Sequence, residues 1–121
     1  MQTFSQTITV SEQQSAAFLG SGILPVFATP AMVAFMENTA MQAMEALLRE
    51  GECSVGTEVN VRHLKASPVG AEITCLACIT QVDGRKVSFE IQATDAAGDI
   101  IGVATHQRFI VSARRFMEKL G

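Results

Sequence analysis

Between Thr29 and Gly51, apolar side chains recur at intervals of three and four residues, which places them on one side of an α-helix. Thr29 suits the N-cap, and Pro30 suits the first helical position because its missing N–H needs no partner there. We expect Gly51 to end the helix. The predicted apolar stripe consists of Val33, Met36, Ala40, Met44, Leu47 and Leu48, and the polar face of Asn38, Gln42, Glu45 and Arg49.

Glu37 falls within this apolar stripe. An ionised carboxylate on a buried face is costly unless it is paired, hydrogen-bonded or protonated, so its position calls for a specific reason. One interpretation is a glutamate near the helix N-terminus that reaches solvent or bonds a backbone group. The other is a catalytic acid or base. The helix pattern alone leaves both interpretations open.

After Gly51 the period of the apolar pattern changes to two, which predicts a half-buried strand ending at His63. Its apolar face is expected to carry Val55, Thr57, Val59, Val61 and His63. Further strands are predicted at residues 73–82, 87–94 and 100–111, and a short one at residues 3–10. Asp83 and Gly84 are typical of a two-residue type I′ hairpin turn, and Ser112 of the cap of a short final helix.

The predicted elements give an α+β fold in one domain over residues 1–121. A long central helix is followed by four strands in an antiparallel meander, and the N-terminal strand makes the sheet five-stranded. A curved sheet that wraps such a helix is the arrangement of the hotdog fold. Because an open sheet exposes edge strands, we expect a homodimer, with pairing of dimers into a tetramer left open.

Composition narrows the functional classes. Hydrophobic residues make up 48% of the chain and charged residues 17%, which favours a large core or an oligomer interface. No apolar run reaches the length of a membrane span, and a net charge of −3 argues against nucleic-acid binding. Residues 1–10 lack the features of a secretory leader, and three cysteines fit a reducing compartment, so a cytoplasmic location is expected. Cys75 and Cys78 lie three apart in a strand, hence on opposite faces, and are interpreted as inert core residues rather than metal ligands.

A series of short motifs resembles the hotdog thioesterases of the fluoroacetyl-CoA thioesterase type, from residue 26 to about residue 116. Each motif is weak alone, but their order and spacing together are specific. They are Val26-Phe27-Ala28-Thr29-Pro30, Met36-Glu37, Gly56-Thr57, His63, Pro68-Val69-Gly70, Val82-Asp83-Gly84-Arg85 and His106-Gln107-Arg108.

The resemblance implies hydrolysis of a short acyl-CoA by Thr29, Glu37 and His63, without a cofactor or metal, in a pocket at a dimer interface. Glu37 would act as general base or nucleophile, His63 as the proton-transfer partner and Thr29 as a positioning hydroxyl. Water attack and a covalent anhydride remain alternatives. The resemblance also implies substrate contacts from Gly56, Pro30 and Arg108. A β-bulge at Gly56 and a structural ion pair at Arg108 are the competing interpretations.

One segment departs from the fluoroacetyl-specific pattern. Residues 20–25, Gly-Ser-Gly-Ile-Leu-Pro, lack the aromatic lid residue that the family places before the helix, so selectivity for a fluorinated acyl group is not expected to follow. Two other functions compete with hydrolysis. The first is a non-catalytic dimer that binds acyl-CoA or another hydrophobic ligand, and the second is a purely structural dimerisation module, which would leave Glu37 without a role.

Overall fold

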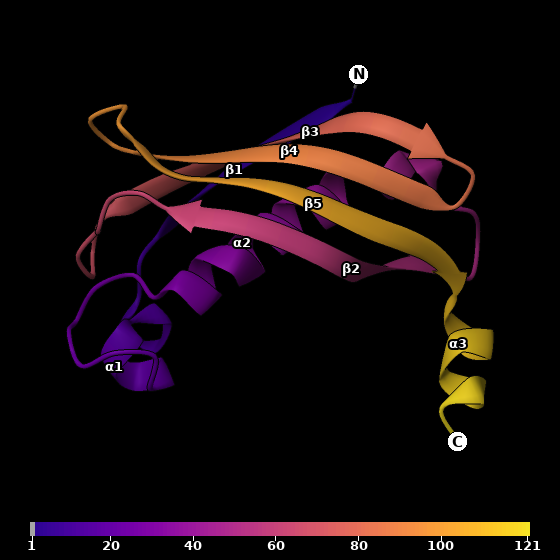
Figure 1. Ribbon diagram of the computed structural model, residues 1–121, viewed down its shortest axis with the longest axis horizontal. Helices are drawn as coiled ribbons and strands as arrows, with labels where there is room; N and C mark the ends of the chain where they lie inside the picture. Colours follow the sequence, from indigo (N-terminus) through magenta and orange to yellow (C-terminus); the bar gives the residue numbers. More distant parts are fainter. Residues whose placement is uncertain (1) are drawn as a thin grey trace.

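The computed structural model describes residues 2–121, and it has the α+β hotdog architecture expected from the sequence, with a five-stranded antiparallel sheet over one long helix (Figure 1). The elements are β1 (Thr3–Thr9), the 3-10 helix η1 (Glu12–Gln14), α1 (Ala16–Leu19), α2 (Thr29–Ala43), the 3-10 helix η2 (Glu45–Leu47), β2 (Glu52–His63), β3 (Glu72–Asp83), β4 (Lys86–Asp95), β5 (Ile100–Ser112) and α3 (Ala113–Lys119). None of the helices in residues 2–121 is long and apolar enough to cross a membrane.

The order of strands differs from the predicted four-strand meander. The sheet runs β1-β3-β4-β5-β2, so only β3, β4 and β5 form a meander, and β2 pairs with β5 at the far edge. The segment 64–71 therefore crosses from one side of the sheet to the other. It is held beneath the sheet by the backbone N–H of Phe27, which donates to the Ser67 carbonyl at 2.8 Å. Strands adjacent in sequence usually pair, and this crossover breaks that rule.

The helix α2 begins one residue earlier than expected. Ala28 is its N-cap, Thr29 is its first residue and Pro30 its second, so the Thr29 hydroxyl does not cap the helix and is free for another partner. The helix ends at Ala43 rather than at Gly51, and η2 and a turn with Gly51 at φ +80° complete the predicted segment. The boundary prediction was wrong because apolar residues continue past the last α-helical turn.

The core lies between α2 and the concave face of the sheet. Met32, Met36 and Ala40 of the helix are fully buried there. The predicted alternation in β4 is confirmed, because Val87, Phe89, Ile91 and Ala93 all face this core. Cys75 lies in the core, whereas Cys78 is only half-buried on the other face, so the prediction of opposite faces is confirmed but the core placement of Cys78 is wrong.

The hairpin between β3 and β4 turns one residue later than predicted. Asp83 pairs with Lys86, and the two loop residues are Gly84 and Arg85. Only Gly84 has a positive φ, of +61°, whereas a type I′ turn needs positive φ at both loop positions. The predicted final helix is present as α3, and the Ser112 side chain accepts a hydrogen bond from the Arg115 backbone N–H, as expected of its cap.

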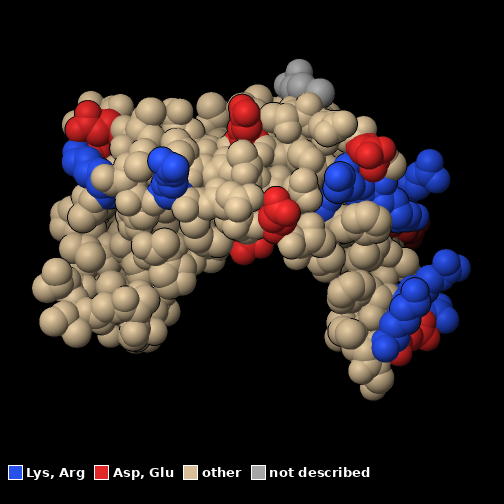
Figure 2. Space-filling view, viewed as in Figure 1, with Lys and Arg blue, Asp and Glu red and all other residues tan. Residues whose placement is uncertain are grey.

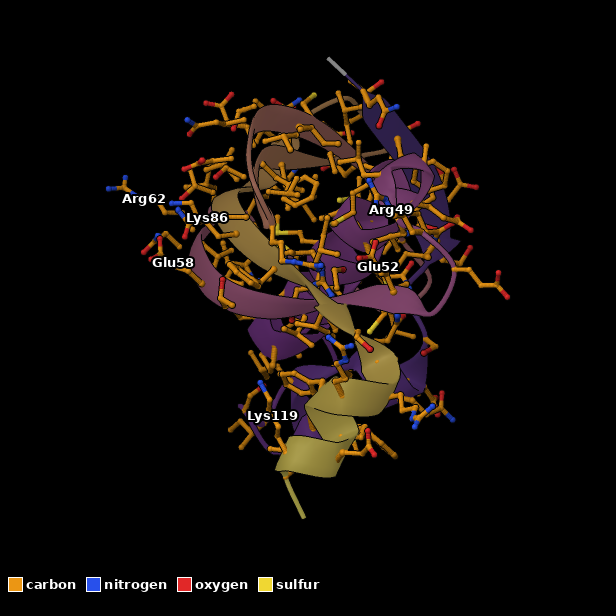
Figure 3. The ribbon with its side chains drawn as sticks, turned by 90° about the vertical axis from the view of Figure 1, so that its right-hand side faces the viewer. Arg49, Glu52, Glu58, Arg62, Lys86 and Lys119 are labelled. Carbon is orange, nitrogen blue, oxygen red and sulfur yellow. The ribbon has the colours of Figure 1, made fainter. Side chains whose placement is uncertain are left out.

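The short helices α1 and α3 project from the two ends of the sheet on the same side as α2 (Figure 1). The space-filling view shows a hollow between these two projections, and basic side chains gather at the end that carries α3 (Figure 2). Figure 3 views the molecule from that end, with Lys119 on α3, and it also shows Glu58 and Arg62 extending from β2. The edge strand β2 borders the hollow, so groups that face inward from β2 lie beside an open edge.

Candidate active site

A β-bulge in β2 decides which of its side chains face the helix. The pairing with β5 passes from Gly56 opposite Arg108 to Glu58 opposite Gln107, which leaves Thr57 as the extra residue. Beyond the bulge, Val59, Val61 and His63 face inward as predicted, but before it the inward positions are Ser54 and Gly56. The prediction that Val55 and Thr57 share the face of His63 was wrong because one extra residue reverses the alternation.

Thr29 and His63 are brought into direct contact. The Thr29 Oγ1 and His63 Nδ1 atoms lie 2.8 Å apart, which joins the first turn of α2 to the end of β2. The ring of Phe27 packs edge-on against the imidazole, with ring centres 6.4 Å apart. A hollow of about 330 Å³ opens beside the pair and extends to Ser21 in the segment before α2. The two residues therefore form one unit next to solvent-accessible space.

The imidazole of His63 is suited to accept a proton. Burial lowers the pKa of His63 below its ordinary value of 6.5, and the backbone of Lys65 opposes this shift. Among residues 2–121, His63 Nε2 is one of two buried side-chain polar atoms without a hydrogen-bond partner. An unpaired buried polar atom in a native fold calls for an explanation, and a substrate or a second copy of the chain would provide a partner.

Glu37 lies beside Gly56 and Arg108, two positions highlighted by the sequence. Arg108 Nη1 is 3.6 Å from Glu37 Oε2, so the ion pair expected of Arg108 is present, while its contact with substrate stays a prediction. A side chain at Gly56 would collide with this same carboxylate oxygen. The β-bulge interpretation of Gly56 is thus confirmed, and the absence of a side chain also makes room for the Glu37 carboxylate, while the substrate contact of Gly56 stays a prediction. The Glu37 side chain is 38% exposed, which leaves it accessible.

Arg108 is held by a network that sequence reasoning only partly found. Its side chain is buried, and it donates from Nε to Ser54 Oγ at 2.8 Å and from Nη2 to the Ser54 carbonyl at 3.1 Å. The third contact is to His106 Nε2, 3.3 Å from Nη1. Ser54 was missed because the predicted alternation placed it on the outer face. A bulge was one interpretation of Gly56, but its effect on the alternation of the strand was not carried into the predicted faces.

The two groups of site residues remain apart within one chain. Eight helical residues separate Thr29 from Glu37, a rise of about 12 Å. His63 and Gly56 lie seven positions apart on β2, or roughly 20 Å. Within residues 2–121, no hydrogen bond or ion pair joins Glu37 to Thr29 or His63. One chain therefore contains a Thr29–His63 couple and a Glu37–Arg108 couple, but not the complete predicted constellation.

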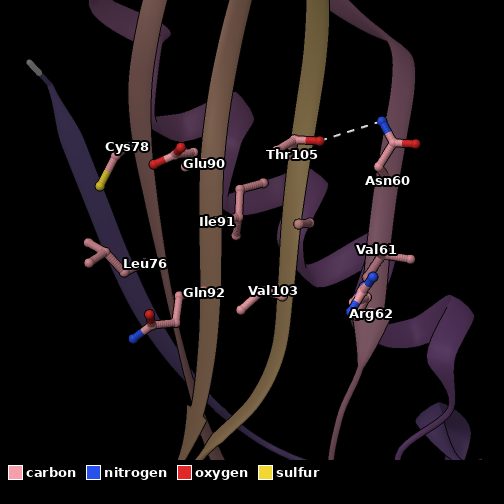
Figure 4. Close-up of a pocket in the computed structure, with 11 residues that line it drawn as sticks. Asn60, Val61, Arg62, Leu76, Cys78, Glu90, Ile91, Gln92, Val103 and Thr105 are labelled. Atoms are coloured by element: carbon pink, nitrogen blue, oxygen red, sulfur yellow. Dashed lines mark hydrogen bonds between the residues drawn. The ribbon is translucent and has the colours of Figure 1, made fainter.

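Pro30 lies on the other side of α2 from these couples. It lines a separate hollow of about 630 Å³, together with Leu19 of α1 and Gln6 of β1. A further groove, of about 610 Å³, crosses the convex face of the sheet (Figure 4). Asn60 and Thr105 are hydrogen-bonded there at 3.4 Å, while Thr29, Glu37 and His63 all lie elsewhere. Neither hollow contains the candidate catalytic groups.

The fold, together with its similarity to known proteins, defines the chain as a hotdog-fold protein of the thioesterase class. A family model described as fluoroacetyl-CoA-specific thioesterase, FlK, matches residues 10–114. The fluoroacetyl-CoA thioesterase of Streptantibioticus cattleyicolor is 39% identical over 95 residues, which cover 78% of this chain and 68% of that enzyme.

Solved structures agree with this relationship. The structure of the fluoroacetyl-CoA thioesterase FlK superimposes with a TM-score of 0.92 at 32% identity, covering 98% of this chain and 91% of the other. A mutant of that enzyme in complex with fluoroacetate and CoA gives a TM-score of 0.88 at 32% identity, covering 94% and 95%. The chain belongs to the FlK thioesterase family and is a thioester hydrolase.

Stability should fall as the pH drops below the ordinary histidine value. Burial lowers the pKa of His63 and of His106 from 6.5, so below that pH the unfolded chain takes up protons that the folded chain does not. Urea unfolding at about pH 7.5 and about pH 5.5 should show lower stability at the lower pH. A His63→Gln variant should lose part of this dependence, and an unchanged dependence in this variant would contradict the assignment to His63.

Gly56→Ala should impair turnover more than folding. The added methyl group would occupy the position of the Glu37 carboxylate oxygen and push it away from Arg108. A displacement of about 1 Å at a catalytic group can cost about 10²-fold in rate. Thioester hydrolysis should therefore drop strongly, while Asn60→Ala, on the outer face of the same strand, should remain near wild type. Equal activity of the two variants would show that the close approach at Gly56 has no catalytic importance.

Proposed function

We propose that the protein hydrolyses a small acyl-CoA thioester in a pocket formed by two copies of the chain, with Thr29, Glu37 and His63 as the catalytic groups. The observation that carries this proposal is the separation of two polar couples along one open sheet edge. His63 has an unpartnered buried nitrogen at one end of β2, and Glu37 is partly exposed near its middle. A second copy with the opposite strand direction would bring the two together.

Symmetry supports this arrangement. Two β2 edges that pair antiparallel about a twofold axis set residues at equal distances from the axis opposite each other. His63 and Gly56 lie on either side of Val59, four and three positions away in sequence. An axis near Val59 places the His63 end of one copy next to the Gly56 and Glu37 region of the other. The pairing also satisfies the exposed edge of β2.

The shape of the chain fits a homodimer of this kind. The hollow between α1 and α3 borders the β2 edge and offers room for part of the second copy (Figure 2). Four large apolar side chains at the α1 end are exposed, which is unfavourable in an isolated chain. They are Phe18, Leu19, Ile23 and Leu24. Further pairing of dimers across the convex face would give a tetramer, and the groove there is the surface available for it.

In the proposed mechanism, Glu37 activates water or attacks the acyl carbon itself, which would give an anhydride that water then cleaves. His63 transfers a proton, and Thr29, through its 2.8 Å contact, holds the imidazole in place. Free backbone N–H groups at the start of α2 lie near Thr29 and would stabilise the oxyanion, because the N-terminus of a helix favours negative charge. In both routes the CoA thiolate leaves when the adduct at the acyl carbon collapses, which gives the product acid directly after water attack or the anhydride after attack by Glu37.

The curated relative acts on fluoroacetyl-CoA, and we propose a small acyl group for this chain as well. Selectivity for fluorine is not part of the proposal, because residues 20–25 contain no aromatic side chain and Ile23 is 90% exposed. We also propose a cytoplasmic location, since all three cysteines are free. Release of CoA thiol from acetyl-, fluoroacetyl-, propionyl-, butyryl-, phenylacetyl- and longer acyl-CoAs would rank the substrates. Binding without any turnover would favour the non-catalytic alternative.

Glu37→Gln should lower the turnover number by about 10²-fold or more, because the amide keeps the volume of the carboxylate but cannot accept a proton or attack carbon. The dimer and the affinity for substrate should persist. His63→Ala should also lower turnover, and the double variant should be less impaired than the product of the single effects, since the groups act as one unit. CoA release on the best substrate measures this, and near-normal turnover of Glu37→Gln would refute the mechanism.

Mixing two inactive variants tests the shared pocket. A heterodimer of Glu37→Gln and His63→Ala chains would contain one site with both substitutions and one site with both native residues, if each site draws on two copies. Refolding the variants together should therefore restore activity, whereas each variant refolded alone should stay inactive. If both groups acted within one chain, every site in the mixture would carry a substitution and no activity would return.

A further inference from the structure

His106 occupies a place in the network that the proposed mechanism does not use. Its ring is buried, and it stacks on Phe89 with ring centres 5.7 Å apart. Its Nδ1 atom is 2.7 Å from the carbonyl oxygen of Glu58, the residue that follows the extra residue of the bulge. A carbonyl can only accept, so Nδ1 carries the hydrogen and donates it. The imidazole thereby holds the strand in the bulged conformation.

This bond fixes the other side of the ring as well. With its hydrogen on Nδ1, the neutral imidazole presents a lone pair at Nε2, which accepts from Arg108 Nη1 at 3.3 Å. Burial lowers the pKa of His106 and the adjacent Arg108 charge adds to this shift, while the bond to the Glu58 carbonyl and the Glu37 charge oppose it, so the neutral ring is favoured. The charged groups facing it are Arg108 and, on α2, Glu37. His106 therefore acts as an acceptor toward Arg108.

Arg108 connects His106 to the carboxylate of Glu37. Its Nε and Nη2 atoms are bonded to Ser54, and Nη1 is shared between His106 and Glu37. The guanidinium is planar, so its bonds to Ser54 and His106 also fix the direction in which Nη1 faces Glu37. The ring of His106 also adjoins Gly56, where an added Cβ would lie 3.4 Å from its Cε1. Arg108 and Gly56, which both adjoin the Glu37 carboxylate, thus lie next to His106.

We propose that His106 is a positioning residue for thioester hydrolysis, which orients Arg108 through Nε2 so that the Glu37 carboxylate is held in its reactive position. This inference rests on the proposed role of Glu37. It assigns His106 no contact with the substrate. A side chain that only filled the core next to Phe89 would affect stability, but it would leave the turnover number of the folded enzyme unchanged.

Two amide substitutions separate these roles. In His106→Asn the short amide reaches the position of Nδ1 and keeps a donor for the Glu58 carbonyl, but nothing replaces Nε2. In His106→Gln the longer amide reaches the position of Nε2 and keeps an acceptor for Arg108. The Asn variant should lose about 10-fold to 100-fold in kcat, the scale of a misplaced catalytic group, with KM within a few-fold of wild type. The Gln variant should recover most of that loss.

Gln107→Ala, one residue away on the opposite face, should leave kcat unchanged. In a Glu37→Gln background, His106→Asn should cause little further loss, because the group it positions is already absent. Equal kcat losses in the Asn and Gln variants, normal kcat in both, or a change confined to KM would each overturn the proposal. A normal turnover of Glu37→Gln alone would instead refute the proposed mechanism, so the two failures are distinguishable.

If His106→Asn does not fold, Ser54→Ala tests whether turnover depends on the orientation of Arg108, through which His106 would act. It removes the acceptor of Arg108 Nε while leaving the ring of His106 in place. A fall in kcat at near-constant KM, with the folded state intact by circular dichroism, would support an orienting network around Arg108. An unchanged kcat would overturn the proposal, because the guanidinium would then not need its bonds to hold Glu37.

Discussion

The site depends on one extra residue in an edge strand. The bulge at Thr57 reverses the alternation of β2, which turns Gly56 and Ser54 toward the helix while His63 also faces inward. A regular strand would face either Gly56 or His63 to the core, but not both, because they are an odd number of positions apart. With the bulge, Gly56 makes room for the Glu37 carboxylate and Ser54 receives Arg108. Bulges occur often beside active sites for this reason.

Burying Arg108 is unfavourable unless its hydrogen-bonding capacity is used. The structure provides the Ser54 hydroxyl and carbonyl, the His106 nitrogen and the Glu37 carboxylate as partners. For a module whose only task is to dimerise, apolar residues of similar volume would serve the core at least as well. The buried guanidinium, oriented toward a partly exposed carboxylate, is therefore better explained by a function of Glu37 than by stability.

The sequence predicted what depends on local pattern. The period of 3.6 located α2, the period of two located the strands, and the inward face of β4 was correct at Val87, Phe89, Ile91 and Ala93. What it could not predict depends on tertiary pairing. The placement of β2 beside β5 requires a crossover of segment 64–71, and the effect of the bulge that Gly56 suggested on the faces of β2 becomes visible only when two strands are in register. Both errors concern the same edge strand that carries the site.

The candidate site residues show the same division. Thr29, Glu37 and His63 were noticed because polar groups fell where apolar ones were expected, and Arg108 was paired as anticipated. Ser54 was missed because the bulge sets the face on which it lies. Pro30 adjoins Thr29 in the sequence motif, but the turn of the helix places it on the far side of α2. Motif spacing identified the residues, but only the fold could group them into two couples.

The division into two couples has a physical consequence for the proposed dimer. Each couple is already assembled within one chain, since Thr29 and His63 are hydrogen-bonded and Glu37 is paired with Arg108. Association then joins rigid halves instead of ordering free side chains, so less conformational entropy is lost when the site forms. Each half lacks what the other holds: the first couple has the proton-accepting imidazole without a carboxylate, and the second has the carboxylate without an imidazole. An isolated chain would therefore not hydrolyse the thioester. Activity would require the same contact between two copies that covers the exposed edge of β2.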